Sequence, residues 1–355
     1  MSSVNLKDLT LPEMEEMVGD LEGKAYNARQ IYDWVFAKGV TQIDDMTNLS
    51  KEFRSRLGEV AGIGTLELVR AHTAADGTRK FLFGLEDGLR IESVLIPDED
   101  RRTLCISTQV GCKLDCKFCL TGVGGFTRNL RAWEIVDQVL SVARELSPEE
   151  KLTNYVFMGM GEPLDNYREV VKAIRLMTDP KGMSISPRRI TLSTSGLAPA
   201  IKKLGQEDLK VNLAVSLNAS SDPVRTRIMP INKKYPLPVL LEACRQFPLA
   251  PRRRITFEYV LLEGVNDSPE QAAELARLLR GIPCKINLIP FNPFPGALFH
   301  RPSPQKLAAF QDILQSSHLT ATIRESRGAD ILAACGQLVT NPQILNELAV
   351  SASVG

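Results

Sequence analysis

The stretch "GCKLDCKFC", residues 111–119, places Cys112, Cys116 and Cys119 within eight positions of one another. A structural zinc site normally has four protein ligands. The only histidines are at 72, 300 and 318, far from the triplet in sequence, and Cys105 lies within a predicted strand. A [4Fe–4S] cluster that is held by three thiolates keeps one iron open for a substrate or cofactor. The spacing Cys-x3-Cys-x2-Cys therefore favours cluster ligation, with structural zinc as the alternative.

The triplet follows the first of six strand-like runs, which alternate with amphipathic helical segments. The runs are "TLCIST" (103–108), "NYVFMGMG" (154–161), "RRITLSTSG" (188–196), "VNLAVSLNA" (211–219), "RITFEYVLLEG" (254–264) and "KINLIPFNP" (285–293). Repeated strand–helix units predict a parallel sheet of the α/β class. Six units are too few for a closed eight-stranded barrel. Polar and glycine-rich residues end most of these runs, so we expect the active site at the carboxyl edge of the sheet.

The residues before this region predict two smaller units. Apolar residues at helical spacing fill 11–23, 27–39 and 49–62, with Asn27 as an expected N-cap and Gly39 as a helix end. Between 63 and 100, polar and apolar residues alternate and Asp-Gly turns intervene, which is typical of an antiparallel hairpin or meander. We therefore divide the chain into a helical domain (1–62), a β extension (63–100), an α/β domain (101–340) and a tail (341–355).

Composition limits the classes of function. The chain has 355 residues, of which 44% are hydrophobic and 24% charged, and its net charge is +1. No overall field attracts nucleic acid, so a polyanion must bind a local patch. No apolar stretch reaches the length of a membrane span, and the first residues do not resemble a signal peptide, so we expect a cytoplasmic protein. In that reducing compartment the seven cysteines are not expected to form structural disulfides, and Cys244 and Cys284 are expected to be packing residues.

The motif Cys-x3-Cys-x-Phe-Cys, on the first strand–helix loop of such a repeat, resembles the radical S-adenosylmethionine (SAM) superfamily. The resemblance implies a partial (β/α)6 barrel. It also implies a cofactor pair, a [4Fe–4S] cluster on Cys112, Cys116 and Cys119 whose open iron binds the amino and carboxylate groups of SAM. Reduction of the cluster then cleaves SAM to a 5′-deoxyadenosyl radical.

Longer motifs resemble the RlmN-type RNA adenine methyltransferases. They are "NARQIYDWVFAKGV", "SVLIP", "CISTQVGC", "KFCLTG", "FMGMGEPLDN", "LSTSG", "PINKKY", "INLIPFNPFPG" and "RGADILAACGQL", which together span roughly residues 10–340. The resemblance implies methylation of adenine C2 in the peptidyl-transferase region of 23S rRNA and in tRNA, just 3′ of the anticodon. That carbon has no adjacent nucleophile, so transfer of a methyl cation is unfavourable there and a radical route is required.

The resemblance also implies three catalytic roles. Cys335 takes a methyl group from one SAM, and a radical from a second SAM activates that group to join adenine. Cys105 then attacks the sulfur, forms a disulfide and frees the base, while Glu92 accepts the ring proton. Each residue also has an ordinary interpretation: Cys335 and Cys105 as buried packing thiols, and Glu92 as a solvated strand carboxylate.

The SAM contacts of the family map onto residues at the strand ends. They are Gly161, Glu162, Ser193, Ser216, Leu217, Asn218 and Asn292. The glycines are expected to let the backbone approach the ligand, and Glu162 to accept a hydrogen bond from its ammonium group. Two positions depart from the pattern, because Asn218 replaces a frequent His and Phe291 a frequent Trp.

The expected partners are RNA and a reduced ferredoxin or flavodoxin, and the default oligomeric state is a monomer. Basic runs at 126–131, 186–189, 232–234 and 251–254 are candidate RNA contacts, although solvated surface is the more common role of any single basic run. The helical domain is expected to bind RNA by resemblance alone. A buried target base would have to be flipped out of its helix.

Three alternatives remain open at this stage. A C8-methylating antibiotic-resistance relative has the same cluster, cysteines and mechanism. A radical SAM enzyme of another reaction class would never carry a methyl group on Cys335. A non-catalytic RNA-binding protein with a structural metal would bind zinc instead of iron.

Overall fold

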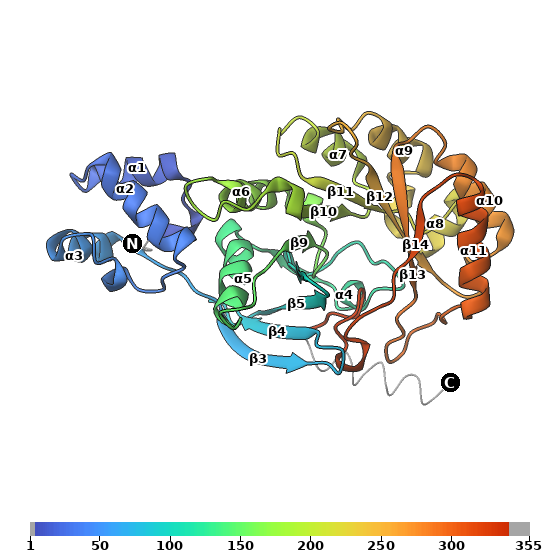
Figure 1. Ribbon diagram of the computed structural model, residues 1–355, viewed down its shortest axis with the longest axis horizontal. Helices are drawn as coiled ribbons and strands as arrows, with labels where there is room; N and C mark the ends of the chain where they lie inside the picture. Colours follow the sequence, from blue (N-terminus) through green and yellow to red (C-terminus); the bar gives the residue numbers. More distant parts are fainter. Residues whose placement is uncertain (1–3, 341–355) are drawn as a thin grey trace.

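A ten-stranded sheet forms the centre of the computed structural model, which describes residues 4–340 (Figure 1). Its order is β14-β13-β12-β11-β10-β9-β6-β5-β4-β3. The strands from β14 to β6 are mutually parallel. They are β6 (Arg101–Cys105), β9 (Asn154–Phe157), β10 (Ile190–Thr194), β11 (Asn212–Ser216), β12 (Ile255–Leu261), β13 (Cys284–Pro290) and β14 (Ala321–Ile323).

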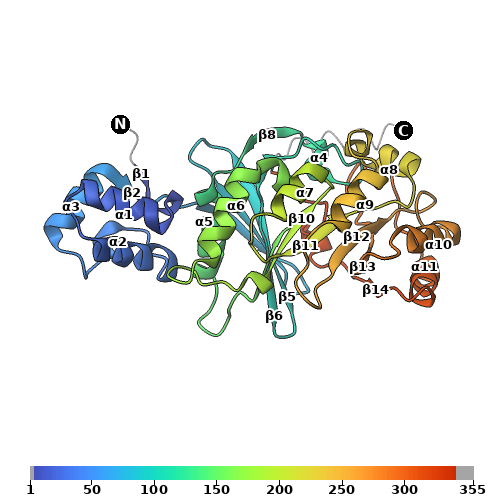
Figure 2. The same cartoon turned by 90° about the horizontal axis from the view of Figure 1, so that it is seen from above.

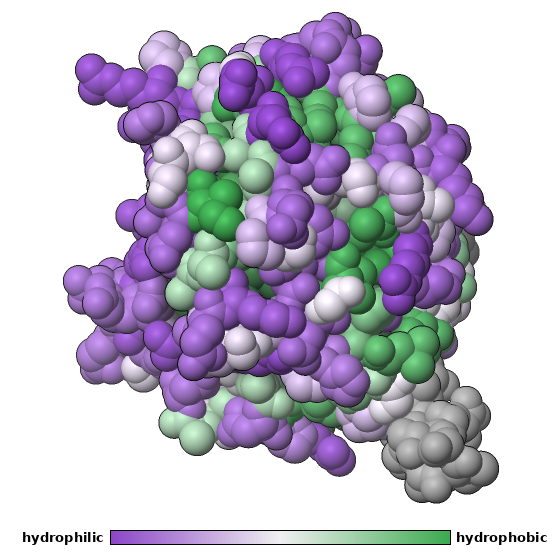
Figure 3. Space-filling model, turned by 90° about the vertical axis from the view of Figure 1, so that its right-hand side faces the viewer, coloured by the Kyte–Doolittle hydropathy of each residue, from purple (hydrophilic) through white to green (hydrophobic). Residues whose placement is uncertain are grey.

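Helices cover the outside of the parallel strands (Figures 1 and 2). They are α5 (Ala132–Arg144), α6 (Tyr167–Thr178), α7 (Ala198–Leu204), α8 (Asp222–Ile228), α9 (Leu237–Arg245), α10 (Pro269–Leu278) and α11 (Pro304–Ser316). Each buries one apolar side; α6, for example, buries Val170, Ile174 and Met177 at helical spacing. The face seen from the side of α10 and α11 is largely hydrophilic, with separate apolar patches (Figure 3).

The open parallel sheet confirms the prediction of a partial barrel. The six predicted strands are β6 and β9–β13, each near its expected position. The seventh parallel strand, β14, was not predicted because its three residues are too few to show an alternating pattern. The two outer strands of the sheet, β3 and β14, do not pair with each other, so the barrel is not closed.

The predicted meander continues the same sheet. Strands β3 (Glu67–Thr73), β4 (Arg79–Gly84) and β5 (Arg90–Asp98) pair antiparallel in sequence, and β5 pairs with β6. Gly77 and Gly88 have φ of 81° and 80° in the two connecting turns, which explains the Asp-Gly sequences there. The meander is therefore an extension of the barrel wall, and its residues contact whatever lies at that end of the barrel.

The N-terminal residues form a helical unit beside the barrel (Figure 2). Its elements are β1 (Val4–Asn5), η1 (Leu6–Asp8), α1 (Leu11–Asp20), α2 (Ala25–Tyr32), the π-helical turn η2 (Asp33–Ala37), η3 (Ile43–Asp45), α3 (Lys51–Val60) and β2 (Ala61–Gly62). The expected N-cap Asn27 is wrong: the helix begins two residues earlier, and the Asn27 side chain accepts a hydrogen bond from the backbone N–H of Lys24. Gly39 ends the helical stretch with φ of 67°, as expected.

A buried ion pair fixes this unit to the barrel. Lys7 Nζ lies 2.5 Å from Asp137 Oδ1 on α5, and both side chains are fully buried. The remaining oxygen of Asp137 accepts from the backbone N–H of Leu66, and Lys7 also donates to the carbonyl of Gly64. Because these partners satisfy both charged groups, breaking one half of the pair would leave an uncompensated buried charge.

Short elements complete the described chain. They are β7 (Gln109–Gly111), α4 (Leu120–Val123), β8 (Phe126–Asn129), η4 (Pro163–Asn166), η5 (Pro187–Arg189), η6 (Pro230–Lys233) and η7 (Ala329–Ile331). None of the helices within residues 4–340 has the length and apolar character needed to cross a bilayer. The expected tail, 341–355, lies outside the described residues.

Candidate active site

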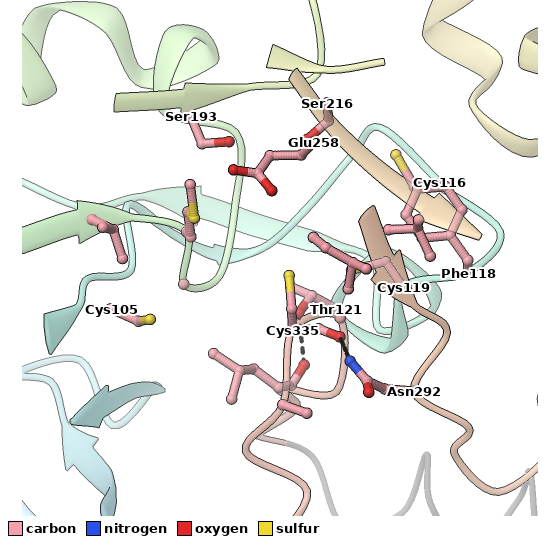
Figure 4. A pocket seen from close by; sticks show the side chains of 18 of the residues that line it. Cys105, Cys116, Phe118, Cys119, Thr121, Ser193, Ser216, Glu258, Asn292 and Cys335 are labelled. Atoms are coloured by element: carbon pink, nitrogen blue, oxygen red, sulfur yellow. Dashed lines mark hydrogen bonds between the residues drawn. The ribbon is translucent and has the colours of Figure 1, made fainter. Parts of the chain in front are cut away.

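A cavity opens at the carboxyl edge of the parallel strands (Figure 4). Residues at or just beyond the ends of β6, β9, β10, β11, β13 and β14 line it, together with β12 side chains, the cysteine loop and the segment around Cys335. This is the edge where the sequence predicted the active site. Parallel strands bring their carboxyl ends together, so residues far apart in sequence meet here.

The loop that carries the cysteine triplet is held mainly by its own backbone. The N–H of Cys119 donates to the carbonyl of Cys116 at 3.0 Å, and the N–H of Cys112 donates to Gly125 at 2.7 Å. The short antiparallel pair β7–β8 closes the base of the loop. Lys117 links the loop to helix α8, because its backbone N–H donates a hydrogen bond to the carbonyl of Ile228.

All three cysteines line the cavity, and their environment suits a cationic group. Burial, and then the neighbouring thiols, raise the pKa of Cys116 well above its usual value. Burial also raises the pKa of Cys112 to about 12, and Cys119 and Glu162 add to that increase. Arg225 is the cation that opposes the shift at Cys116. Three thiolates here require more positive charge than the chain supplies, and an iron–sulfur cluster provides it.

The described residues do not offer a single-ion site. Across residues 4–340, no three His, Cys, Asp or Glu side chains converge closely enough to hold one metal ion. Structural zinc needs four ligands around one centre, whereas the thiolates of a cluster attach to separate irons.

Buried Arg225 supports the floor of the cavity. Its guanidinium donates to the carbonyls of Ser195, Ser216 and Leu217 and to the side chain of Asn232. Desolvation by burial lowers its pKa to about 10, so the group still carries its charge at neutral pH. The sequence analysis did not identify this residue, because an arginine within a short helix is usually on the surface.

Gly161 and Glu162 both line the cavity. Position 161 requires glycine because of a close contact within the protein itself. A Cβ on Gly161 would lie 2.5 Å from Cβ of Gln109, and the φ of Gly161 is +97°. We expected these glycines to let the backbone approach a ligand. Gly161 also lets strand β7 pack closely against it, so that expectation is incomplete. Glu162 is buried; its carboxylate accepts from the N–H groups of Leu164 (3.0 Å) and Ser195 (2.7 Å), which leaves further lone pairs for a ligand.

Ser193, Ser216 and Glu258 all face the cavity (Figure 4). Glu258 on β12 lies directly opposite Ser216 in the strand register. Its buried carboxylate accepts from Nδ2 of Asn287 at 2.9 Å, and burial raises its pKa. The sequence analysis missed Glu258, although a glutamate inside an otherwise apolar strand was the available signal.

The structure separates Leu217 and Asn218 from the other expected SAM contacts. Leu217 is fully buried in the core and does not line the cavity. Asn218 lines it with a φ of 58°, but its Oδ1 accepts from the N–H of Val260 and its Nδ2 donates to the sulfur of Met229. The side chain of Asn218 therefore first connects strand β12 to the residue that follows α8.

Cys335 stands in the cavity on a segment that many distant residues hold. Asn292 Nδ2 donates to the carbonyl of Cys335 at 3.1 Å (Figure 4). The N–H of Leu120 donates to Gly336, and the hydroxyl of Thr121 donates to Leu338, both at 2.7 Å. Asn292 was expected to contact SAM; in this structure it also positions the segment of Cys335.

Cys105, the last residue of β6, and Cys335 are free thiols that point into the same cavity (Figure 4). The surface of Cys335 is exposed because the cavity is open to water, yet protein atoms surround it. This desolvation raises the pKa of Cys335 to about 12 and that of Cys105 to about 11. Arg324, just beyond β14, is the cation that opposes both shifts. Cys244 and Cys284 are buried in the core, as expected.

Glu92 lies next to the cavity and does not line it. The residue is buried on β5, and its carboxylate forms an ion pair with Lys80 at 2.9 Å and accepts from the N–H of Val339 at 2.9 Å. Burial raises its pKa, and Lys80 partly opposes this. The interpretation of Glu92 as a solvated carboxylate is therefore wrong, and the segment of Cys335 covers it.

Two of the four basic runs lie away from the cavity. Residues 186–189 precede β10 and residues 251–254 precede β12, so both runs lie at the amino edge of the sheet. In the run 126–131, Arg128 is neutralised by Asp87 and Glu134. The charge pattern of the sequence alone did not separate runs near the site from runs on the opposite edge.

Comparisons with known proteins agree with this geometry. The radical SAM superfamily matches residues 106–276, and the ribosomal RNA large subunit methyltransferase N-terminal domain matches residues 4–63. "Dual-specificity RNA methyltransferase RlmN" of Syntrophobacter fumaroxidans is 53% identical over 96% of this chain and 99% of its own length. The protein of the same name from Geobacter sulfurreducens is 52% identical over 94% of this chain and 92% of its own length.

A solved structure extends the likeness to three dimensions. A radical SAM methyltransferase from Sphaerobacter thermophilus has a TM-score of 0.89 and 47% sequence identity, and the match covers 94% of this chain and 98% of that one. The open parallel barrel with three cavity-lining cysteines defines a radical SAM protein. The RlmN relatives are about half identical to this chain over nearly its whole length. The chain therefore belongs to the RlmN family of dual-specificity RNA methyltransferases.

Proposed function

We propose that this protein methylates carbon 2 of adenosine in 23S rRNA and in tRNAs, through a methylated cysteine and a covalent RNA adduct. One observation carries the proposal: Cys105 and Cys335, some 230 positions apart in sequence, are both free thiols in the cavity that the cysteine triplet lines. Packing alone gives no reason to place two further thiols beside the triplet.

The residues present suit the cofactors of the superfamily. Cys112, Cys116 and Cys119 would hold a [4Fe–4S] cluster, and Gly161, Glu162, Ser193, Ser216 and Asn292 would contact SAM. The contacts of Leu217 and Asn218 would be limited, because the core holds the first and two hydrogen bonds hold the second. When bound, the cluster and SAM supply a one-electron reductive cleavage that gives a 5′-deoxyadenosyl radical.

Cys335 would carry the methyl group, and after loss of one hydrogen atom the methyl carbon would bond to C2 of adenine. Cys105 would then attack the sulfur of Cys335, so that an S–S bond forms and the bond from that sulfur to the new methyl carbon breaks. The C2 proton leaves to Glu92, the freed methyl carbon takes a proton, and the unpaired electron returns to the electron carrier. A thiol reductant later restores both cysteines.

The protonation state of the two thiols, of which Cys335 is exposed to the open cavity and Cys105 is partly buried, bears on the order of these steps. Because their pKa values lie near 11 and 12, both groups are protonated in the free protein at neutral pH. A protonated thiol is a poor nucleophile, so each proton must leave to a base before attack, and the positive charge of Arg324 would favour the thiolate that remains. This delays attack by either thiol until such a base is present.

The partners belong to the proposal as well. The substrates are RNA, the electron donor is a reduced ferredoxin or flavodoxin, and the protein acts as a monomer in the cytoplasm. The helical unit at 4–62 would contact RNA, and its buried Lys7–Asp137 pair keeps it fixed to the barrel. A target base held within a helix would be flipped into the cavity.

Mass spectrometry of the protein purified without oxygen tests the proposal. We expect one added methyl group on the peptide that contains Cys335, and none in the Cys112→Ala variant. Cys244→Ala is the matched control, because it removes a core thiol that does not line the cavity and should keep the modification. A bare Cys335 in cluster-loaded, SAM-supplied protein would overturn the proposal. Mapping the methylated carbon on product RNA separates C2 from the C8 alternative.

A further inference from the structure

Lys80 and Glu92 form an ion pair on neighbouring strands of the meander. Lys80 lies on β4 opposite Val94, and Glu92 is two residues from Val94 on β5, so the two side chains are diagonal neighbours on one face. Their charged groups are 2.9 Å apart, and the side chains are only 13% and 6% exposed. This shielding from water strengthens the attraction between the two charges, while burial itself disfavours the ionised form of Glu92.

The same two side chains hold both ends of the segment that carries Cys335. Lys80 Nζ donates to the carbonyl of Leu332 at 3.2 Å, and Glu92 Oε2 accepts from the N–H of Val339 at 2.9 Å. Leu332 precedes Cys335 by three residues and Val339 follows it by four. One ion pair thus forms a clamp across residues 332–339.

The segment needs such a clamp because it contributes little regular structure of its own. It follows the single turn η7, and Leu332 adopts φ of 52°, a left-handed conformation that is unfavourable for a leucine. Strained, irregular backbone persists only where surrounding contacts hold it. Lys80 contributes its contact at the strained residue itself.

We propose that Lys80 is a positioning residue for Cys335: together with Glu92 it fixes residues 332–339 so that the thiol stands in the cavity. The assignment of Cys335 as methyl carrier rests on the proposed function, whereas the clamp is a property of the fold. Lys80 is not among the residues that line the cavity, and its ammonium group bonds Leu332 and Glu92, so it acts through the segment.

The clamp has a consequence for Glu92. While its carboxylate accepts from Val339 and pairs with Lys80, the segment covers it and it does not line the cavity. For Glu92 to receive a proton from the substrate, residues 332–339 must move away. On the proposed role of Glu92, the clamp would be closed while Cys335 is presented and would open when the adduct is resolved.

Hydrogen–deuterium exchange of the cluster-loaded, full-length protein tests the clamp. Lys80→Met should raise exchange in the peptide that covers residues 332–339 by about tenfold or more, because a buried carboxylate loses its partner. Lys80→Arg keeps the charge and should restore most of the protection. Arg79→Met is the matched control: it breaks the adjacent ion pair of β4, with Glu150, which does not contact this segment.

Two outcomes would overturn the inference. One is unchanged exchange in Lys80→Met; the other is an equal increase in Arg79→Met, which would mean general loosening of the meander. The methyl content of Cys335, measured on the same samples, should fall in Lys80→Met while iron content stays at the wild-type level. A wild-type protein without methyl on Cys335 would contradict the proposed function and leave the exchange result as an independent test of the clamp.

Discussion

Two irregular segments face the same cavity and are held in opposite ways. The cysteine loop, residues 111–125, is closed by its own backbone bonds and by the β7–β8 pair. The segment 328–339 has a few internal bonds and is held largely by other elements: Asp76 in the β3–β4 turn, the clamp of Lys80 and Glu92, and Asn292. Leu120 and Thr121 of the cysteine loop also bond to it, so the two segments support each other. One is a local structure, and the other depends on the whole fold.

The difference corresponds to the two chemical tasks proposed for these segments. A cluster needs ligands at fixed spacing, and a short loop with local bonds supplies that spacing with few other requirements. A cysteine that carries a group between reactants needs a defined position that it can also leave. Hydrogen bonds from several separate elements, each worth about 1 kcal/mol, hold such a segment and still allow it to open.

The largest expected effect is on the local segment. Cys116→Ala should reduce iron and acid-labile sulfide to background, because a cluster cannot be retained on the two remaining thiolates. The circular dichroism spectrum should stay unchanged, since the loop is closed by backbone bonds that the substitution leaves intact. Cys284→Ala, which removes a core thiol instead, should keep its iron. Full iron content in Cys116→Ala would show that the triplet is not the ligand set.

An intermediate effect is expected for the segment held from a distance. Asn292→Ala removes one hydrogen bond to the carbonyl of Cys335 and should destabilise the closed segment by about 1 kcal/mol. Limited proteolysis at residues 328–339 should then be about fivefold faster. Asn212→Ala is the control, because that side chain bonds backbone carbonyls at the opposite edge of the sheet. If both variants were cleaved at the same rate within residues 328–339, the other contacts would be enough to hold the segment without Asn292.

The smallest expected effect concerns Glu258, which lines the cavity opposite Ser216. Burial raises the pKa of its carboxyl, so the folded protein binds that proton more tightly than the unfolded chain does. Ionisation therefore costs stability as the pH rises above the ordinary glutamate value. Glu258→Gln should raise the melting temperature by about 2 °C at pH 8 and by less at pH 5.5.

Differential scanning fluorimetry between pH 5.5 and pH 8 measures this difference in melting temperature. The surface variant Glu149→Gln should leave the melting temperature unchanged at either pH. A lower melting temperature for Glu258→Gln at pH 8 would show that Arg324 and Lys285, the cations facing Glu258, outweigh its burial.

The features of the site that depend on local sequence could be predicted, and those that depend on distant contacts could not. Cys112, Cys116 and Cys119 were recognisable from spacing alone, and the carboxyl-edge location followed from the strand–helix repeat. Glu258 and Arg225 were missed because a charge within a strand or helix does not reveal that the fold buries it. The packing of Leu217 and the hydrogen bonds of the Asn218 side chain were missed because their partners lie on other elements of the fold.

By itself, the sequence determined the parallel strand–helix repeat, the meander, the helical unit and the cysteine spacing, because periodicity and short-range motifs are local properties. Only the tertiary structure decided which thiols share a cavity, that Glu92 is covered and paired with Lys80, and that two basic runs lie on the far edge. These facts depend on strand order and on contacts between residues hundreds of positions apart. No local pattern encodes such contacts, because they arise when the sheet assembles and buries its side chains.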